Sequence, residues 1–185
     1  MKLYTKRLIL RDLEKKDARD IVENLNNVNV SKNLQIVPYP YTKKHAIEFI
    51  KNCRKQIGKK NRSSCEFGII QKSNNNLAGI IGITKIDKFQ GTATIGYWLG
   101  ENYWRQGIMS EAFERILDFA FKTLKLRRID IAAWTKNISS NALIKKMGFK
   151  YEGMRRKRGR TKATGEIYDV YVYGLLKDEL ARKKR

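Results

Sequence analysis

The stretch that most limits how this chain can fold changes from strand to helix across one glycine-containing turn. Residues 94–99 form a strand-like stretch, and an apolar stripe with helical spacing runs from about residue 110 to 124. Gly107 lies in the turn between them. A turn that opens directly onto a helix points several backbone N–H groups, and the positive end of the helix dipole, at one place. The stretch therefore predicts a binding site for an anion such as a pyrophosphate.

The remaining segments predict a mixed sheet with helices on both of its faces. Strands are expected at 8–10, 65–70, 77–86, 92–99, 128–134, 150–158 and 167–176, and further helices at 17–26, from residue 42, and in a short segment ending at Gly148. Strands joined by short turns should be antiparallel, whereas the strand–helix–strand unit around Gly107 should be a parallel crossover. The expected fold class is α+β, with one mixed, mostly antiparallel, twisted sheet of about seven strands. A single domain over residues 1–185 is the simplest arrangement.

The composition is that of an ordinary globular chain, with 42% hydrophobic and 10% aromatic residues. No apolar run approaches the roughly 18 residues of a membrane-spanning helix, and the N-terminal segment lacks a signal peptide's apolar stretch. Cys53 and Cys65 form neither a CxxC pair nor a disulfide framework, and no zinc-type ligand cluster is present. These features predict a cytoplasmic protein without a metal site.

The charge is the unusual bulk property, because 40 Lys and Arg against 18 Asp and Glu give a net charge of +22. Such a surface attracts phosphates, nucleic acid and acidic proteins. The excess is spread along the whole chain, with one dense cluster at 155–162 that holds six cations and no acid. Two interpretations of this cluster stay open, a solvated hairpin loop or a contact with a polyanion or substrate.

Several blocks of the chain, in order, resemble one enzyme family. The run YWLGENYWRQGIMSEA at 97–112 is similar to the acyl-CoA-binding motif of GNAT-type N-acetyltransferases, in the ribosomal-protein-alanine and -serine (RimJ/RimL-like) branch. Segments 5–11, 39–42, 137–149, 151–153 and 169–176 are also similar to that branch. One departure is Met109, which stands where the family usually has a small residue. The resemblance implies the GNAT fold, acetyl-CoA as donor, and direct transfer to an amine in a ternary complex.

The resemblance also implies which residues hold the cofactor. A gap between the strands at 94–99 and 128–134 would receive the pantetheine arm and free backbone groups near Tyr97, Trp98 and Leu99. Asn137 would contact that arm, and Ser140 would donate a hydrogen bond to the departing thiolate. The pyrophosphate cradle would be formed by the amides of Arg105, Gln106, Gly107, Ile108, Met109 and Ser110.

The catalytic base is less well defined by the sequence. In some relatives a glutamate after the Glu-Gly pair is the proposed base, but this chain carries Gly159 or a neighbour there. Glu101, Glu166 and Asp169 stay open as alternatives. An N-terminal amine, with an unperturbed pKa near 8, needs only a weak base or a water chain. His45, the single histidine, is interpreted as a surface or packing residue.

The leading function is acetyl-CoA-dependent acetylation of a primary amine, most simply the α-amine of an acidic or ribosomal protein. Tyr39, Tyr41 and Arg156 are expected on the acceptor side. The alternatives are a basic nucleic-acid- or ribosome-binding module on a GNAT scaffold, a small-molecule amine acetyltransferase, and an acyl-CoA sensor without activity. Contact with the ribosome or RNA through the basic surface, and a homodimer, are further expectations.

Overall fold

The computed structural model describes residues 1–59 and 61–183. Its strands are β1 (Lys2–Tyr4), β2 (Leu8–Asp12), β3 (Cys65–Gln71), β4 (Leu77–Asp87), β5 (Thr92–Leu99), β6 (Arg128–Trp134), β7 (Lys150–Arg160) and β8 (Ile167–Leu176). Its helices are α1 (Ala18–Leu25), α2 (Val28–Ser31), α3 (Lys43–Arg54), α4 (Ile108–Asp118), α5 (Ile138–Lys146) and α6 (Lys177–Lys183). No helix among the described residues is both long and apolar enough to cross a membrane.

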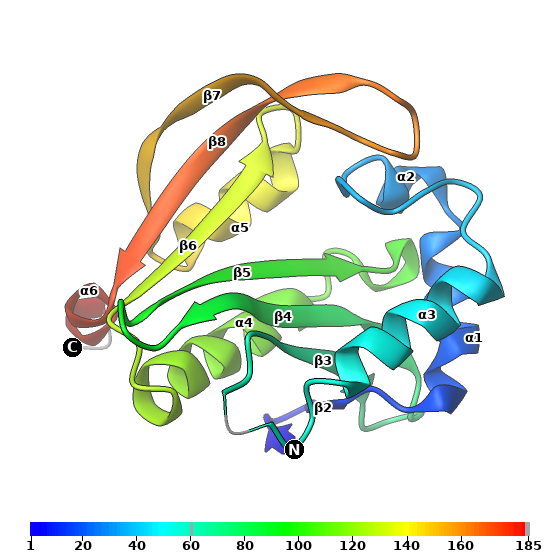
Figure 1. Cartoon of the computed structure of the whole chain (residues 1–185), viewed down its shortest axis with the longest axis horizontal. Coiled ribbons are helices and arrows are strands. Elements are labelled where there is room, and N and C mark those ends of the chain that lie inside the picture. Colours follow the sequence, from blue (N-terminus) through cyan, green and yellow to red (C-terminus); the bar gives the residue numbers. More distant parts are fainter. Residues whose placement is uncertain (60, 184–185) are drawn as a thin grey trace.

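One sheet contains all eight strands, in the order β1-β2-β3-β4-β5-β6-β8-β7 (Figure 1). Among the described strands only β5 and β6 pair in parallel, so the expected mixed, mostly antiparallel sheet of an α+β fold is confirmed. The strand beyond the seven expected is β1, which pairs antiparallel with β2. With three residues it is too short to show a convincing alternation in the sequence.

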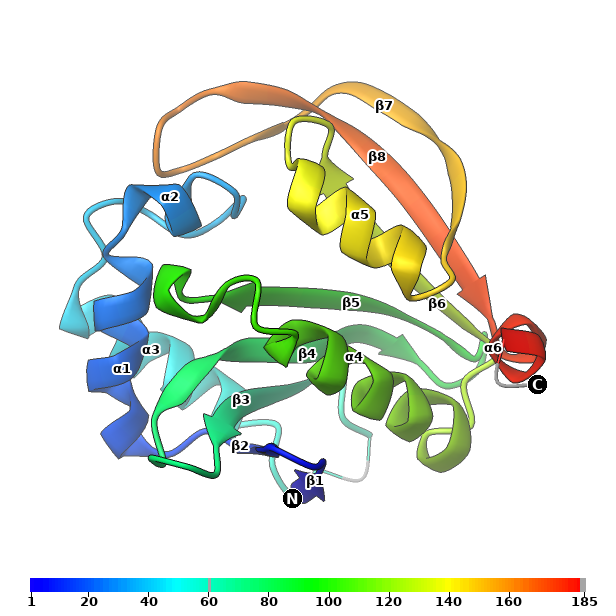
Figure 2. The same cartoon turned by 180° about the vertical axis from the view of Figure 1, so that it is seen from behind.

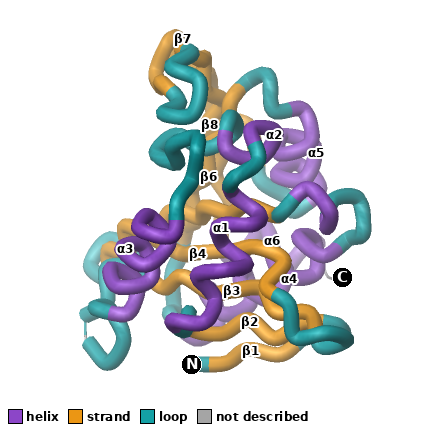
Figure 3. The backbone as a smooth tube through the Cα atoms, turned by 90° about the vertical axis from the view of Figure 1, so that its right-hand side faces the viewer, coloured by secondary structure: helices purple, strands orange, loops and turns teal. Residues whose placement is uncertain are grey.

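Helices cover both faces of the sheet, as expected. Figures 1 and 2 show α3 and α4 from opposite sides, and Figure 3 shows them on either side of the strands. Two buried clusters match this division. One packs α4 and α5 against the sheet around Phe113 and Ile144, and the other packs α1 and α3 around Ile21 and Ile50. The strands between them carry apolar residues on both faces, which is why β4 is buried through most of its length.

The central strands separate in the middle of the sheet. β5 and β6 pair only where Thr92–Thr94 meet Arg128–Asp130, and residues 95–99 have no partner on that side among the described strands. Beyond this point the two strands spread apart, which Figure 1 shows as a wedge between β5 and β6. The expected gap between these strands is therefore present.

The β7–β8 ribbon arches across the open end of this wedge and reaches the segment after α2 (Figure 2). At its tip the Thr161 hydroxyl donates to the Leu34 carbonyl at 3.1 Å, and the Lys162 N–H donates to the Gln35 carbonyl at 3.1 Å. The basic cluster expected in a hairpin loop lies mainly in strand β7, which continues to Arg160. The reason is that β7 resumes pairing with β8 after a register shift between Arg155 and Gly159.

Two helix boundaries differ from the sequence-based expectation. α4 begins at Ile108 rather than about residue 110, because Gly107 takes the left-handed conformation just before it. After Asp118 the helix continues as a π-helical segment, Phe119–Thr123. Asp17 precedes α1 as expected, but its carboxylate does not cap that helix. It accepts from the Glu14 backbone N–H at 2.7 Å and forms a two-pronged ion pair with Arg11 at 2.8 Å.

Candidate active site

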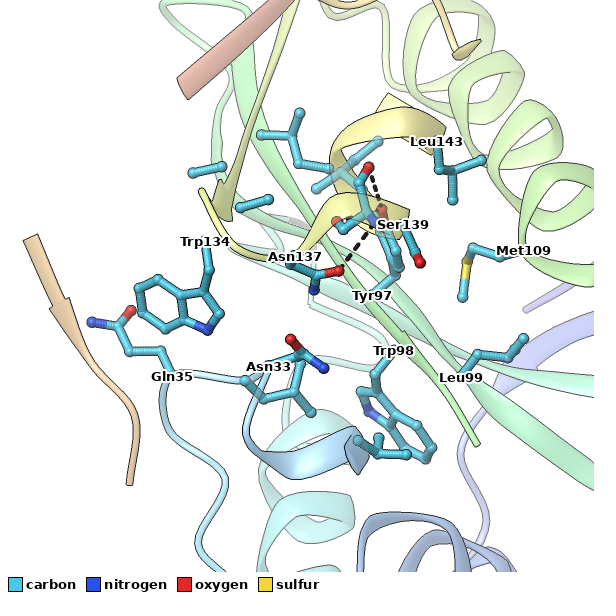
Figure 4. Close-up of a pocket in the computed structure, with 18 of the residues that line it drawn as sticks. Asn33, Gln35, Tyr97, Trp98, Leu99, Met109, Trp134, Asn137, Ser139 and Leu143 are labelled. Carbon is cyan, nitrogen blue, oxygen red and sulfur yellow. Dashed lines mark hydrogen bonds between the residues drawn. The ribbon is translucent and has the colours of Figure 1, made fainter. Parts of the chain in front are cut away.

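A cleft of about 1100 Å³ occupies the wedge between β5 and β6. Its walls come from β5, the start of α4, β6, the start of α5, the β7–β8 ribbon and the segment after α2 (Figure 4). Because segments from most of the chain meet here, the cleft is the principal candidate site. Ten of the eleven residues expected to bind a cofactor line it: Tyr97, Trp98, Leu99, Arg105, Gly107, Ile108, Met109, Ser110, Asn137 and Ser140.

The turn before α4 forms one end of the cleft. Gly107 has φ +73° and ψ +3°, a left-handed conformation that costs a residue with a Cβ about 1–2 kcal/mol. Arg105 also has a positive φ of +59°. The turn leads into an eleven-residue helix, whose first backbone N–H groups lack partners within the helix and whose dipole is positive at this end. The geometry suits a phosphate or pyrophosphate.

Gln106, the eleventh expected residue, is not part of the cleft lining. Its carbonyl accepts from Arg7 Nη1 at 3.0 Å, and its side-chain amide donates to the Asn102 carbonyl at 2.8 Å. Both contacts hold the turn in place. No local sequence pattern predicts the contact with Arg7, because that residue lies 99 positions away.

Glu111, in the first turn of α4, joins this helix to the segment between β1 and β2. Its carboxylate accepts from the Thr5 hydroxyl at 2.6 Å, from the Arg7 backbone N–H at 2.8 Å and from Arg7 Nε at 2.6 Å. Burial alone would raise the pKa of Glu111, but the hydrogen bonds from Thr5 and Arg7 outweigh it and lower that pKa. An acidic residue in the first turn of α4 also interacts favourably with the helix dipole. Glu111 thus connects the β1–β2 turn to the start of α4.

Two hydroxyl groups that line the cleft are within hydrogen-bond distance of each other. The Tyr97 phenol oxygen lies 2.9 Å from Ser140 Oγ, and the Ser140 backbone N–H donates to Asn137 Oδ1 at 3.1 Å (Figure 4). Asn137 is therefore the N-cap of α5, and this contact fixes both the helix start and the amide orientation. Burial raises the pKa of Tyr97 to about 12, so this phenol keeps its proton at neutral pH.

The acidic candidates lie in different surroundings. Glu101 lines the cleft and accepts from Asn27 Nδ2 at 2.6 Å and Asn29 Nδ2 at 3.1 Å. Glu166 is exposed, outside the cleft lining, and bonded to the Tyr168 hydroxyl, which lowers the pKa of Glu166. Asp169 accepts from the Lys157 backbone N–H at 2.6 Å and lies in a separate depression. Glu101 is the carboxylate that the fold brings to the cleft.

The residues expected on the acceptor side are not in the cleft lining. Tyr41 is buried in the α1–α3 cluster, with its ring centroid 5.4 Å from that of His45. His45 accepts from the Thr42 backbone N–H at the start of α3, consistent with a structural role. Tyr39 is exposed, and Arg156 lies beside Asp169 in the separate depression. Their acceptor roles stay predictions.

Other residues of the basic strand do line the cleft. Arg155, Arg158 and Gly159 contribute from β7, and Trp134 from the end of β6. No sequence motif marks Trp134, and Arg155 and Arg158 are predicted only as part of the basic cluster at 155–162. The register of β6, β8 and β7, which sets their common face, depends on pairings between distant segments.

Comparison with known proteins supports the assignment that the cleft suggests. Residues 7–150 match the family model described as "Acetyltransferase (GNAT) domain". The chain is 35% identical over 181 residues to "Uncharacterized N-acetyltransferase p20" of Bacillus licheniformis, covering 97% of this chain and 98% of that protein. It is 35% identical over 79 residues to the "Ribosomal-protein-serine acetyltransferase" of Escherichia coli strain K12, covering 43% and 44% of the two chains.

Among solved structures, the chain is similar to the microcin C7 self-immunity acetyltransferase MccE, whose crystal structure contains acetyl-CoA and AMP. The TM-score is 0.79 at 25% identity, over 93% of each chain. The family match covers most of the chain, and the fold has the strand separation expected of it. The chain therefore belongs to the GNAT acetyltransferase family and is an acyltransferase that uses acetyl-CoA.

Proposed function

We propose that this enzyme transfers the acetyl group of acetyl-CoA to the N-terminal α-amine of a protein, directly and within a ternary complex. One observation carries the proposal: a single cleft joins the Gly107 turn, the Tyr97–Ser140 hydroxyl pair and a wall of basic residues from β7. The local similarity to a ribosomal-protein-serine acetyltransferase favours a protein acceptor.

The residues of the cleft fit the cofactor. Gly107 adopts the left-handed φ of +73° that this turn requires, a conformation that glycine takes without strain. Arg105 adds a cation beside it, and Leu99, Met109 and Leu143 give apolar walls for an extended arm (Figure 4). Residues 95–99, unpaired on their β6 side, offer backbone groups to amides of the arm. The Leu99 carbonyl already accepts from Trp104 Nε1 at 2.8 Å.

Acetyl-CoA supplies the acetyl group as a thioester, and the chain supplies hydrogen bonds and proton acceptors. We assign Ser140 to donate a hydrogen bond to the departing thiolate. Tyr97 keeps its proton because its pKa is raised to about 12 by burial, so it can donate to Ser140 Oγ. This arrangement directs the Ser140 proton into the cleft, where a hydroxyl group is useful to a leaving group.

We assign Glu101 as the residue that receives the proton of the amine, directly or through water. It is the carboxylate in the cleft lining, and Asn27 and Asn29 hold its two oxygens. An α-amine is partly neutral near pH 7, whereas a lysine with a pKa near 10.4 is not. A modest base therefore suits an α-amine better than a lysine side chain.

A second candidate acceptor is a small anionic amine. The similarity to MccE, whose structure contains AMP together with acetyl-CoA, favours it. The basic wall of the cleft would suit either acceptor. Contact of β7 with RNA or the ribosome, and a homodimer, remain further predictions.

The test is steady-state release of CoA with a peptide that begins with serine and contains one lysine. The matched control is the same peptide with its N-terminus already blocked by an acetyl group. Turnover with the free peptide alone supports the proposal. Equal turnover with both peptides would assign the reaction to lysine, and turnover only with small amines would favour the second candidate.

A further inference from the structure

We propose that Trp134 and Arg155 form an anion subsite in the cleft, which binds a carboxylate of the acceptor molecule close to its reacting amine. The proposal rests on the proposed acetyl transfer to an acceptor amine, and it specifies the chemistry by which that acceptor is recognised. Its starting point is a hydrogen-bond donor in the cleft wall that has no partner.

The unpartnered donor is the indole N–H of Trp134. This side chain is 92% buried, since only 8% of the residue is exposed, and Nε1 has no hydrogen-bond acceptor among the described residues. Native proteins rarely leave a buried N–H without a partner, because this costs the full desolvation of the group. Trp134 lines the cleft, and Figure 4 shows its ring nitrogen directed toward the space bordered by Asn33 and Asn137. A ligand in that space would supply the missing acceptor.

The indole ring is held in a fixed position. A Cβ at Gly159 would lie 2.3 Å from Trp134 Cζ3 and 2.4 Å from Cη2, so the ring packs directly on this glycine. The Tyr168 ring stacks nearby, with a centroid separation of 5.4 Å and an interplanar angle of 35°. A fixed donor loses little entropy when it binds. Asn33 and Gln35 line the same cleft. The Nε1 atom is itself buried, so a ligand that accepts from it must displace neighbouring side chains.

Basic side chains line the same cleft as this donor. Trp134 pairs with Val170 across β6 and β8, and Val170 pairs with Arg155 across β8 and β7. Paired residues of antiparallel strands point to the same face of the sheet, so Arg155 stands on the face of Trp134, two strands away. Arg158 and Lys136 also line the cleft. Among the described residues no carboxylate forms an ion pair with Arg155 or Arg158 within 4.0 Å, so their charges are available to a ligand.

These features together favour an anionic group over a neutral one. A neutral carbonyl would satisfy the indole N–H but would leave the arginine charges without a counter-ion. A carboxylate accepts from the indole and from a guanidinium at once, and such charge-assisted bonds are about twice as strong as neutral ones. An acidic side chain near the N-terminus of the acceptor satisfies this requirement.

The experiment compares two peptide amides, Ser-Glu-Glu-Gly-Gly-Tyr and Ser-Gln-Gln-Gly-Gly-Tyr, which differ only in charge. Peptide binding is measured by calorimetry without acetyl-CoA, and acetylation is measured as kcat/KM. The variants are Trp134→Phe, which removes the donor and keeps a ring, and Arg155→Gln. Trp104→Phe is the matched control, because the Trp104 N–H is already satisfied by the Leu99 carbonyl. Unchanged acetyl-CoA affinity in Trp134→Phe shows that the variant is folded.

We expect the wild-type enzyme to bind the Glu peptide at least about tenfold more tightly than the Gln peptide, the scale of a hydrogen bond to a charged group. Trp134→Phe and Arg155→Gln should each remove most of that preference, and Trp104→Phe should keep it. Equal binding of the two peptides, no binding of either, or an equal loss for both peptides in Trp134→Phe would overturn the anion subsite. If the Glu peptide binds selectively but is not acetylated, the subsite stands and the proposed α-amine reaction fails.

Discussion

The phenol oxygen of Tyr97 and the hydroxyl oxygen of Ser140 lie 2.9 Å apart, one on β5 and the other on α5. Both residues line the cleft, so the hydrogen bond links β5 to α5 in the cleft wall. In the proposed mechanism Tyr97 donates in this bond, so that the Ser140 hydroxyl is free to donate to the leaving group. Tyr97 also packs against Phe113 of α4, with ring centroids 5.4 Å apart.

Replacing Tyr97 by phenylalanine should lower kcat about tenfold, equivalent to about 1.4 kcal/mol in the barrier, because Ser140 loses the donor that orients it. The KM for acetyl-CoA should change little, since the ring still packs on Phe113. Steady-state kinetics with saturating acceptor would measure both quantities. A Tyr97→Phe enzyme with unchanged kcat would contradict the role given to this hydrogen bond, and Ser140→Ala should be at least as slow.

Replacing Gly107 by valine should lower acetyl-CoA affinity at least tenfold. The left-handed φ of +73° is strained for a β-branched residue, by about 1–2 kcal/mol or more, and the added side chain would crowd the anion cradle. Isothermal titration calorimetry would measure the affinity. Arg156→Ala is the control and should bind acetyl-CoA like the wild type, because Arg156 lies outside the cleft lining. Equal affinity in Gly107→Val would place the cofactor elsewhere.

Replacing Glu111 by glutamine should reduce the free energy of unfolding at pH 7 by about 1–2 kcal/mol, the range for hydrogen bonds to a charged group. The pKa of Glu111 is lowered in the folded protein, so its stabilising contribution is present above the unfolded pKa and is lost as the pH falls through the folded pKa. The difference between wild type and Glu111→Gln should therefore shrink on acidification below about pH 4.5. Urea unfolding at pH 7 and in this acid range would measure it, and a difference that grows toward acid would contradict the assigned contacts.

The effects of Gly159→Ala and Trp134→Phe on the free energy of unfolding should be strongly non-additive. Alanine at 159 would clash with Cζ3 and Cη2 of the Trp134 ring, and overpacking of this kind costs about 1–3 kcal/mol. Phenylalanine at 134 lacks these outer ring atoms, so Gly159→Ala should cost under about 1 kcal/mol in that background. Chemical unfolding of the two single variants and the double variant would measure the coupling. Simple additivity would mean that the ring does not pack on Gly159 as described.

Much of the fold and the cofactor end of the site could be predicted, because the signals there are local in sequence. The alternation of β5, the turn at Gly107 and the apolar stripe of α4 follow one another within a short stretch. The N-cap contact between Asn137 and Ser140 spans three residues. Local patterns of this kind depend on periodicity and capping, which a sequence displays directly.

The acceptor end could not be predicted to the same extent. Trp134 and Arg155 share a face only through the register of β6, β8 and β7, and a shift of one residue would turn either side chain away. The support of the cradle by Arg7 and Glu111 joins residues 104 apart. The burial of Tyr41 depends on the packing of α1 on α3, which the aromatic loop around it did not indicate.

If the acetyl group goes to an α-amine, as proposed, the most direct test is to locate it on the product. The enzyme and acetyl-CoA are incubated with the peptide amide Ser-Glu-Glu-Gly-Lys-Tyr, which offers an α-amine and a lysine in one molecule, and the product is sequenced by tandem mass spectrometry. We predict that the acetyl group lies on the N-terminal nitrogen and that the lysine is unmodified. An acetyl group on the lysine, or no product from an enzyme that binds acetyl-CoA, would contradict the proposed function.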